Sequence, residues 1–337
     1  MSEIPKIRVG ISVGDPNGIG FEVILKTFED KRIFDFFTPI AFAHSRNFIE
    51  EKKKLSLSTN IFSLKNIKNP NKGQLNVLET WEKPFSIAYG KEQLKAGAHA
   101  ISSLEAATSA LKDGNIDVLV TAPIHKKSIQ SEIFSFPGHT DYLNQKLEGN
   151  SLMFMVTDSL KVALISDHIP LKEVVGYLTE EKITSKIILL EKSLQQDFGI
   201  QRPKIAVLGI NPHNGDNGVI GKEDDTLLSP LLKKLQEKGS LVFGPFPADG
   251  FFGNQSYTKF DAVLATYHDQ GLIPFKTLSF GEGVNFTAGL NYVRTSPDHG
   301  TAFDIAGKGV ANPTSFTTAT YRAREIFIHR QNAVAKD

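Results

Sequence analysis

Residues 204–215 read KIAVLGINPHNG, an apolar run that passes directly into a polar turn. The Ile, Ala, Val and Leu residues predict a buried strand, and the Asn-Pro-His-Asn-Gly that follows predicts a loop. Two further runs end in the same way: VALIS at 162–166 precedes His168, and AVLAT at 262–266 precedes His268. Because helical patterns separate these strands, the sequence predicts an α/β fold with a mostly parallel sheet.

The same alternation extends along the chain. We expect further strands at 7–13, 39–43, 117–122 and 151–156, and helices at 21–28, 92–111, 179–196, 223–237 and 315–329. Residues 51–75 are rich in Lys, Asn and Ser and predict surface loops with one edge strand. Parallel α/β sheets bind ligands beyond the carboxyl ends of their strands, so the polar clusters found there are the candidate site.

Composition limits the classes of protein that need to be considered. A length of 337 residues predicts two domains, because one core rarely grows beyond about 250–300 residues. The 38 Lys and Arg against 37 Asp and Glu give a net charge of +1, which argues against a nucleic-acid binder. The chain lacks both an apolar signal core in its first eight residues and an apolar stretch of about 18 residues, so we expect a cytoplasmic protein without a membrane partner.

The three histidines that follow apolar strands form the first candidate site. The chain has 9 His and no Cys, so a metal has to be held by imidazoles and carboxylates. Rings that follow parallel strands can converge at one edge of the sheet, and His168, His213 and His268 therefore predict a site for a divalent metal. The alternative is that each histidine is only a polar residue at the start of a loop.

A second set of residues predicts the binding of an anion. Lys276 and Arg294 can bind a phosphate or carboxylate, with Asn285 as an added donor. The alternative is three unrelated surface residues. In the loop after Pro137-Gly138, His139 and Thr140 can face one ligand, although Thr140 can also cap a helix that begins at Asp141.

Eight motifs in order extend over nearly the whole chain, and together they resemble the 4-hydroxythreonine-4-phosphate dehydrogenase family of vitamin B6 biosynthesis. They are GDPNGIG (14–20), FPGHTDYL (136–143), SDHIPL (166–171), GINPHNGDNG (209–218), PFPADGFF (245–252), YHDQGLIPFK (267–276), GVNFTAGL (283–290) and RTSPDHGTAFDIAGKG (294–309). The run from His299 to Pro313 also resembles the adenosine-binding loop of isopropylmalate and isocitrate dehydrogenases. The resemblance implies two α/β/α domains with a cleft between them, which we place at 1–135 plus 300–337 and at 136–299.

The resemblance also implies a reaction. The C3 hydroxyl of 4-phosphohydroxy-L-threonine would be oxidised with NAD or NADP, and the 3-oxo acid would lose CO2 to give 3-amino-2-oxopropyl phosphate. One divalent metal, Zn, Mg or Co, would assist. The family is homodimeric with a metal site completed across the interface, and we expect His268 to come from the partner.

The resemblance assigns roles to individual residues. The metal ligands are His168, His213 and His268. The substrate-binding residues are His139, Thr140, Lys276, Asn285 and Arg294. The cofactor-binding residues are His299, Gly300, Thr301, Ala302, Asp304 and Asn312. The two candidates for the catalytic acid or base are Asp249 and Lys276.

Two other functions are alternatives to this predicted reaction. The first is a related dehydrogenase of four-carbon sugar-acid phosphates such as threonate or erythronate 4-phosphate, which would share the metal and phosphate residues. The second is a binding or regulatory protein for a phosphorylated ligand on the same scaffold, which would form no NADH with any such substrate.

Overall fold

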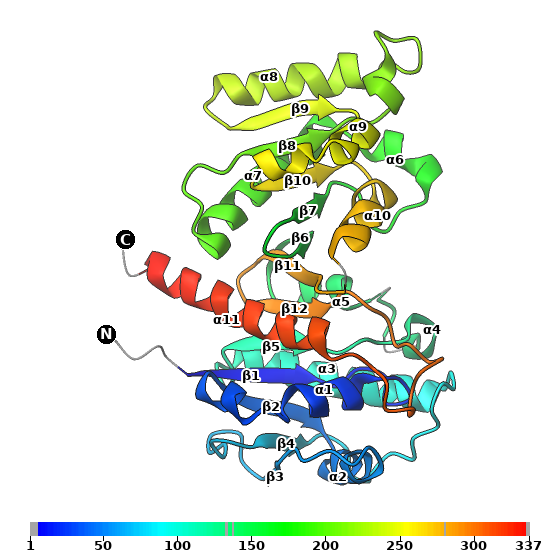
Figure 1. The fold of residues 1–337 in the computed structure, drawn as a ribbon, viewed down its shortest axis with the longest axis vertical. Helices are drawn as coiled ribbons and strands as arrows, with labels where there is room; N and C mark the ends of the chain where they lie inside the picture. Colours follow the sequence, from blue (N-terminus) through cyan, green and yellow to red (C-terminus); the bar gives the residue numbers. More distant parts are fainter. Residues whose placement is uncertain (1–5, 132–133, 137, 280, 335–337) are drawn as a thin grey trace. The chain divides into compact units, whose positions relative to one another are not determined.

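The computed structural model describes residues 6–131, 134–136, 138–279 and 281–334. The chain forms two compact units (Figure 1). The first unit comprises Met1–Gly149 and Leu290–Phe327, and the second comprises Asn150–Gly289 and Ile328–Asp337. The sequence-based limits, 1–135 plus 300–337 and 136–299, stay a prediction about domains and differ from the bounds of these units.

The first unit contains a parallel sheet. In spatial order its strands are β3 (Ile61–Leu64), β4 (Leu75–Glu79), β2 (Phe37–Ala43), β1 (Ile7–Ser12), β5 (Val118–Thr121) and β12 (Arg294–Pro297). Every residue of β2 is buried, as expected of a central parallel strand covered on both faces. The expected edge strand within 51–75 is present as β3.

Helices connect and cover these strands. They are α1 (Gly20–Thr27), α2 (Ser45–Lys54), α3 (Leu94–Lys112), α4 (Lys126–Ile129), α5 (His139–Lys146) and most of α11 (Thr314–Val334), with the 3₁₀ turn η1 (Lys31–Asp35). The Ala- and Leu-rich α3 buries one face against β1, β2 and β5. The surface loop expected at residues 51–54 is wrong, because α2 continues through them with Phe48 and Glu51 buried on its inner face.

The second unit contains a mixed sheet. In spatial order its strands are β11 (Val284–Leu290), β6 (Gly149–Val156), β7 (Lys161–Leu164), β10 (Ala262–Ala265), β8 (Ile205–Leu208) and β9 (Val242–Phe246). The strands β7, β10, β8 and β9 are parallel, and β6 runs antiparallel to β7. The predicted α/β fold with a mostly parallel sheet is therefore confirmed.

The second unit also contains several helices. They are α6 (Leu171–Tyr177), α7 (Glu180–Phe198), α8 (Ser229–Glu237), α9 (Ala248–Gly253) and α10 (His268–Ser279), with the 3₁₀ turns η2 (Pro212–Gly215) and η4 (Ser256–Lys259) and the π-helical turn η3 (Asp224–Leu228). The predicted helix at 179–196 is confirmed as α7. The Thr179 hydroxyl caps its start by accepting from the Lys182 N–H at 3.3 Å, and Gly199 ends it in the left-handed conformation.

Candidate active site

The three predicted metal ligands follow three neighbouring strands of the second unit. His168 comes after β7, His268 after β10 and His213 after β8. The strand β10 lies between β7 and β8, and all three are parallel. The histidines therefore follow the same edge of the sheet, which is the edge where α/β sheets bind their ligands.

Two of the three imidazoles lie close together. The ring centroids of His168 and His268 are 5.8 Å apart. The Nδ1 atom of His268 is 2.7 Å from the Asp269 carboxylate, which orients the ring and directs Nε2 away from that contact. Within the described part of the chain, no group of three His, Asp or Glu side chains is close enough to hold a metal. One chain therefore pairs His168 with His268 and does not bring His213 to them.

The donor atoms nevertheless suit a divalent metal. Imidazole nitrogens are common ligands of Zn and Co, and a carboxylate hydrogen-bonded to the second ring nitrogen is the usual support for such a ligand. The pair His268 and Asp269 has this arrangement. At His168 the neighbouring carboxylate is used differently, because Asp167 accepts from the His168 backbone N–H at 2.7 Å.

In the first unit, Arg294 begins β12 and is among the largest fully buried side chains of the described residues, with 1% of its surface exposed. Burial lowers the pKa of its guanidinium to about 9. Its Nη2 and Nε atoms donate to the Thr121 hydroxyl at 2.6 and 3.2 Å. A guanidinium held away from water at the start of a strand is suited to bind an anion that enters the site.

His139 lies beside this guanidinium. It is the first residue of α5, and its Nε2 atom is buried with no hydrogen-bond partner among the described residues. Burial, together with the Arg294 charge, holds the pKa of His139 well below its usual value. The neutral ring therefore has a free polar atom to offer a ligand. The alternative in which Thr140 caps a helix that begins at Asp141 is wrong, because α5 begins two residues earlier, at His139, and Gly138 occupies the cap position.

We predict that His139 makes the folded chain less stable in mild acid. Since its pKa in the folded chain is depressed, the unfolded chain binds a proton below pH ~6.5 that the folded chain does not bind. The resulting stability is present above that pH and is lost as the pH falls, by at most ~1.4 kcal/mol per pH unit. The free energy of unfolding of His139→Asn, measured in urea, should therefore decline less steeply than that of the wild type between about pH 7 and pH 5. Parallel pH profiles would contradict this assignment.

The remaining substrate and acid–base candidates belong to the second unit. Asn285 lies in β11, and its Oδ1 atom is buried without a hydrogen-bond partner in the described chain. Lys276 is exposed on the last turn of α10, and Asp249 is exposed in the first turn of α9. The buried, unsatisfied atoms of His139 and Asn285 are of the kind that a bound ligand satisfies.

The expected cofactor loop lies in the first unit, between β12 and α11. Its carbonyls at Gly309 and Ala311 accept from the Lys26 ammonium at 2.9 and 2.7 Å, and the Ala311 N–H donates to Glu22 at 2.8 Å. A Cβ on Gly307, whose φ is +75°, would lie 2.6 Å from the Tyr89 ring, so only glycine fits there. The loop is thus held by Glu22 and Lys26 of α1 and by Tyr89, and no motif in the sequence marks these residues as its support.

The individual loop residues differ in their roles. The Nε2 atom of His299 is buried and has no hydrogen-bond partner among the described residues, which leaves it available to a ligand. The Thr301 carbonyl accepts from the Ile19 N–H at 3.1 Å and ties the loop to the GDPNGIG turn. The Asn312 side chain accepts from the Thr314 N–H at 2.9 Å, so it also supports the start of α11. Asp304 is exposed.

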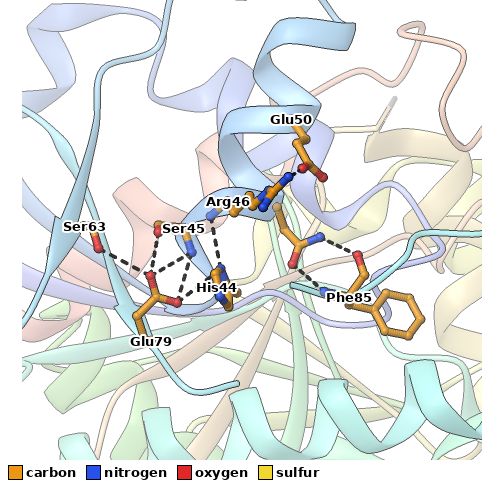
Figure 2. Close-up of polar contacts among 8 residues, drawn as sticks. His44, Ser45, Arg46, Glu50, Ser63, Glu79 and Phe85 are labelled. Carbon is orange, nitrogen blue, oxygen red and sulfur yellow. Dashed lines mark hydrogen bonds and ion pairs between the residues drawn. The ribbon is translucent and has the colours of Figure 1, made fainter. Parts of the chain in front are cut away.

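A second polar cluster, shown in Figure 2, lies after β2 and at the end of β4. The Glu79 carboxylate accepts from the Ser45 N–H and hydroxyl at 3.2 and 2.5 Å and from the Ser63 hydroxyl at 3.3 Å, and it lies 3.4 Å from His44 Nδ1. These contacts are internal to the cluster. They join α2 to the neighbouring strands, and we interpret the cluster as structural.

The fold and its polar edges define a two-unit α/β protein with histidines gathered after neighbouring strands. The family model described as "Pyridoxal phosphate biosynthetic protein PdxA" matches residues 35–323. The chain belongs to this family, and the resemblance stated from the sequence is confirmed.

Individual relatives agree with this assignment. A 4-hydroxythreonine-4-phosphate dehydrogenase of Bacteroides thetaiotaomicron is 46% identical over 332 residues, which cover 98% of this chain and 91% of the relative. A solved structure of the enzyme of the same name from Klebsiella pneumoniae has a TM-score of 0.81 at 31% identity, covering 96% of this chain and all of that one (100%). An isocitrate dehydrogenase from Methylococcus capsulatus, with 14% identity and a TM-score of 0.51 over 97% of this chain and 88% of its own, shares the fold alone. In the described residues, we find no helix that is both long and apolar enough to cross a membrane.

Proposed function

We propose that this chain is a 4-hydroxythreonine-4-phosphate dehydrogenase of pyridoxal 5'-phosphate biosynthesis. It oxidises the C3 hydroxyl of 4-phosphohydroxy-L-threonine with NAD or NADP, and the product loses CO2 to give 3-amino-2-oxopropyl phosphate. The observation that carries the proposal is the placement of His168, His268 and His213 after three neighbouring parallel strands. The names of the relatives support the same reaction.

The histidines are proposed to hold one divalent metal, which can be Zn, Co or Mg. A metal held by these histidines would supply Lewis acidity: it would lower the pKa of the substrate hydroxyl and would stabilise negative charge on that oxygen during decarboxylation. The protein's part is to fix the imidazoles, which the contact between His268 and Asp269 does for one ring.

The substrate anion is proposed to bind Arg294 and His139, with Thr140, Lys276 and Asn285 as further contacts. A buried guanidinium makes stronger hydrogen bonds to phosphate than an exposed one, because water competes less. The neutral His139 ring donates one hydrogen bond without adding charge. These contacts orient the substrate so that its C3 hydroxyl is presented for oxidation.

The loop that contains His299, Gly300, Thr301, Ala302, Asp304 and Asn312 is proposed to bind the nicotinamide cofactor, which accepts the hydride. The contacts of Glu22 and Lys26 fix the backbone of this loop before the cofactor arrives. Asp249 and Lys276 are the proposed acid–base residues, because both are exposed ionisable groups on helices of the second unit.

We propose that the chain acts as a homodimer. The helices next to His168 and His268 expose apolar side chains: Leu171 on α6 is 70% exposed and Ile273 on α10 is 63% exposed. Large apolar side chains beside a site are typical of surfaces that associate. The partner would complete the metal site, with His268 as the shared ligand expected from the sequence or His213 as the shared ligand if His168 and His268 act as a pair within one chain.

Turnover with purified substrates tests the proposed reaction. With a divalent metal and either NAD or NADP, 4-phosphohydroxy-L-threonine should give reduced cofactor, monitored at the absorbance of NADH or NADPH. Reduction with threonate or erythronate 4-phosphate alone would replace the proposal with the related sugar-acid dehydrogenase. No reduction with any of these substrates would favour a binding or regulatory protein.

A further inference from the structure

His213 lies in an unusual backbone segment. All six consecutive residues at 213–218 have positive φ, from 45° at Asp216 to 85° at Gly218. Four of the six carry side chains, and a residue with a side chain is strained in the left-handed region. Such a segment persists only where the surrounding structure holds it. We call residues 213–218 the left-handed turn.

A buried carboxylate fixes the backbone from which this turn begins. Asp224 is fully buried (0% exposed). Its two oxygens accept from the backbone N–H groups of Ile210 and Asn211 at 2.7 and 2.9 Å, and from the Asn211 side-chain amide at 3.0 Å. Glu223 accepts from the same amide at 2.8 Å. Hydrogen bonds to a charged acceptor are the stronger kind, so this set firmly anchors the residues just before His213.

Asn214, the second residue of the left-handed turn, also packs close to Asp224. The Asn214 side chain donates to the Pro245 carbonyl at 2.8 Å. A Cβ on Gly209 would lie 2.2 Å from Asn214 Oδ1 and 3.1 Å from Asp224 Oδ1, so the turn and the carboxylate both pack on this glycine. The Gly209 carbonyl in turn accepts from Gln270 on α10 at 2.6 Å. Asp224 thus lies where the left-handed turn meets the helix that carries His268.

We propose that Asp224 is a positioning residue for the metal site. Asp224 acts on His213 through the backbone and not by direct contact. By fixing Ile210 and Asn211, it holds the left-handed turn and sets the direction in which the His213 imidazole is presented. The inference rests on the proposed function, in which His213 is a metal ligand. Asp224 is followed by Asp225, an exposed carboxylate in the same turn η3, which provides a matched control.

The test uses the full-length protein and Co2+ as the probe. Asp224→Asn preserves the shape of the side chain but removes its charge and turns one acceptor into a donor that faces N–H groups. It should weaken Co2+ binding by ~10–100-fold, the usual effect of losing support behind a ligand, and should alter the visible absorption of bound Co2+. Asp225→Asn should leave both the dissociation constant and the spectrum unchanged.

The outcomes separate positioning from a purely structural role. If Asp224→Asn lowers only the melting temperature while affinity and spectrum match the wild type, the inference is overturned. If Asp224→Asn does not fold, Asn211→Ala replaces it in the test. This variant removes only the side-chain amide that donates to both Asp224 and Glu223. Weaker Co2+ binding by Asn211→Ala supports the inference, and unchanged binding contradicts it. If His213→Ala itself retains wild-type Co2+ affinity, His213 is not a metal ligand. The proposed function then fails at this residue, and the inference about Asp224 fails because it rests on that function.

Discussion

Replacing His213 with Ala is expected to lower kcat by at least about 10³-fold, because several kcal/mol of charge stabilisation are lost with the metal and each ~1.4 kcal/mol corresponds to a factor of ten. Metal content per protomer, measured by atomic emission, should fall together with kcat. The fold should remain, since His213 is exposed and its side chain is not part of a core cluster. Wild-type activity with wild-type metal content would refute the metal role.

The left-handed turn itself supplies the control for this variant. Asn217 has a φ of 53°, almost equal to the 52° of His213, and both side chains are exposed. Asn217→Ala therefore introduces the same backbone strain as His213→Ala without removing an imidazole. It should retain both metal and turnover. Equal losses in the two variants would show that strain in the turn, and not the imidazole, explains the effect.

Mixtures of inactive variants locate the ligand that comes from the partner. If His213 and His268 in one site come from different protomers, mixing His213→Ala with His268→Ala restores about a quarter of the wild-type activity, since half of the randomly formed dimers are mixed and each has one intact site. Mixing His168→Ala with His213→Ala then distinguishes the two candidates, because this mixture restores activity if His213 is the shared ligand and does not if His268 is. No recovery in either mixture would mean that one chain provides all three ligands.

The fold was predictable from the sequence because the patterns that mark buried strands lie within short stretches of the chain. Buried strands such as β8 and β10 appear as short apolar runs, and a polar residue at the end of each run marks the edge of the sheet. The neighbouring order of β7, β10 and β8 was not predictable from these runs, because strand order depends on the packing of helices such as α7 and α10 across the whole unit. This order is what brings His168 and His268 together.

The supporting residues of the site were harder to predict. The sequence predicted Arg294 as an anion ligand but did not predict its burial, since a polar residue at the start of a short strand has no local sign of being covered. Glu22 lies in the helix predicted at 21–28, yet its bond to the Ala311 N–H joins positions 289 residues apart in the sequence. Asp224 lies among the acidic residues of 223–225, where only the fold distinguishes a buried carboxylate from its exposed neighbour.

We expect Arg294 to lower the free energy of unfolding of the ligand-free protein and to strengthen substrate binding. A guanidinium whose pKa is lowered to about 9 by burial is charged at neutral pH at a cost in desolvation. Replacing a buried charge with an apolar side chain of similar length is often neutral or stabilising. Arg294→Met should therefore unfold in urea with a free energy equal to or above that of the wild type. Because the unfolded chain retains the proton above pH ~9 and the folded chain releases it, the stability of the wild type relative to Arg294→Met should rise as the pH increases beyond that point.

The same variant should bind substrate poorly. Hydrogen bonds to a charged group contribute about 1.5–3 kcal/mol, so the KM for 4-phosphohydroxy-L-threonine should rise by ~10–100-fold. The change in kcat should be smaller, provided the phosphate is held equally in the ground and transition states. Arg294→Lys, which retains the charge but loses the planar fork, should raise KM without any gain in stability. If Arg294→Met instead unfolds more easily and leaves KM unchanged, Arg294 supports the core and not the substrate. The free energy of unfolding and the KM of the Arg294 variants together therefore decide whether this buried charge serves substrate binding or the stability of the fold.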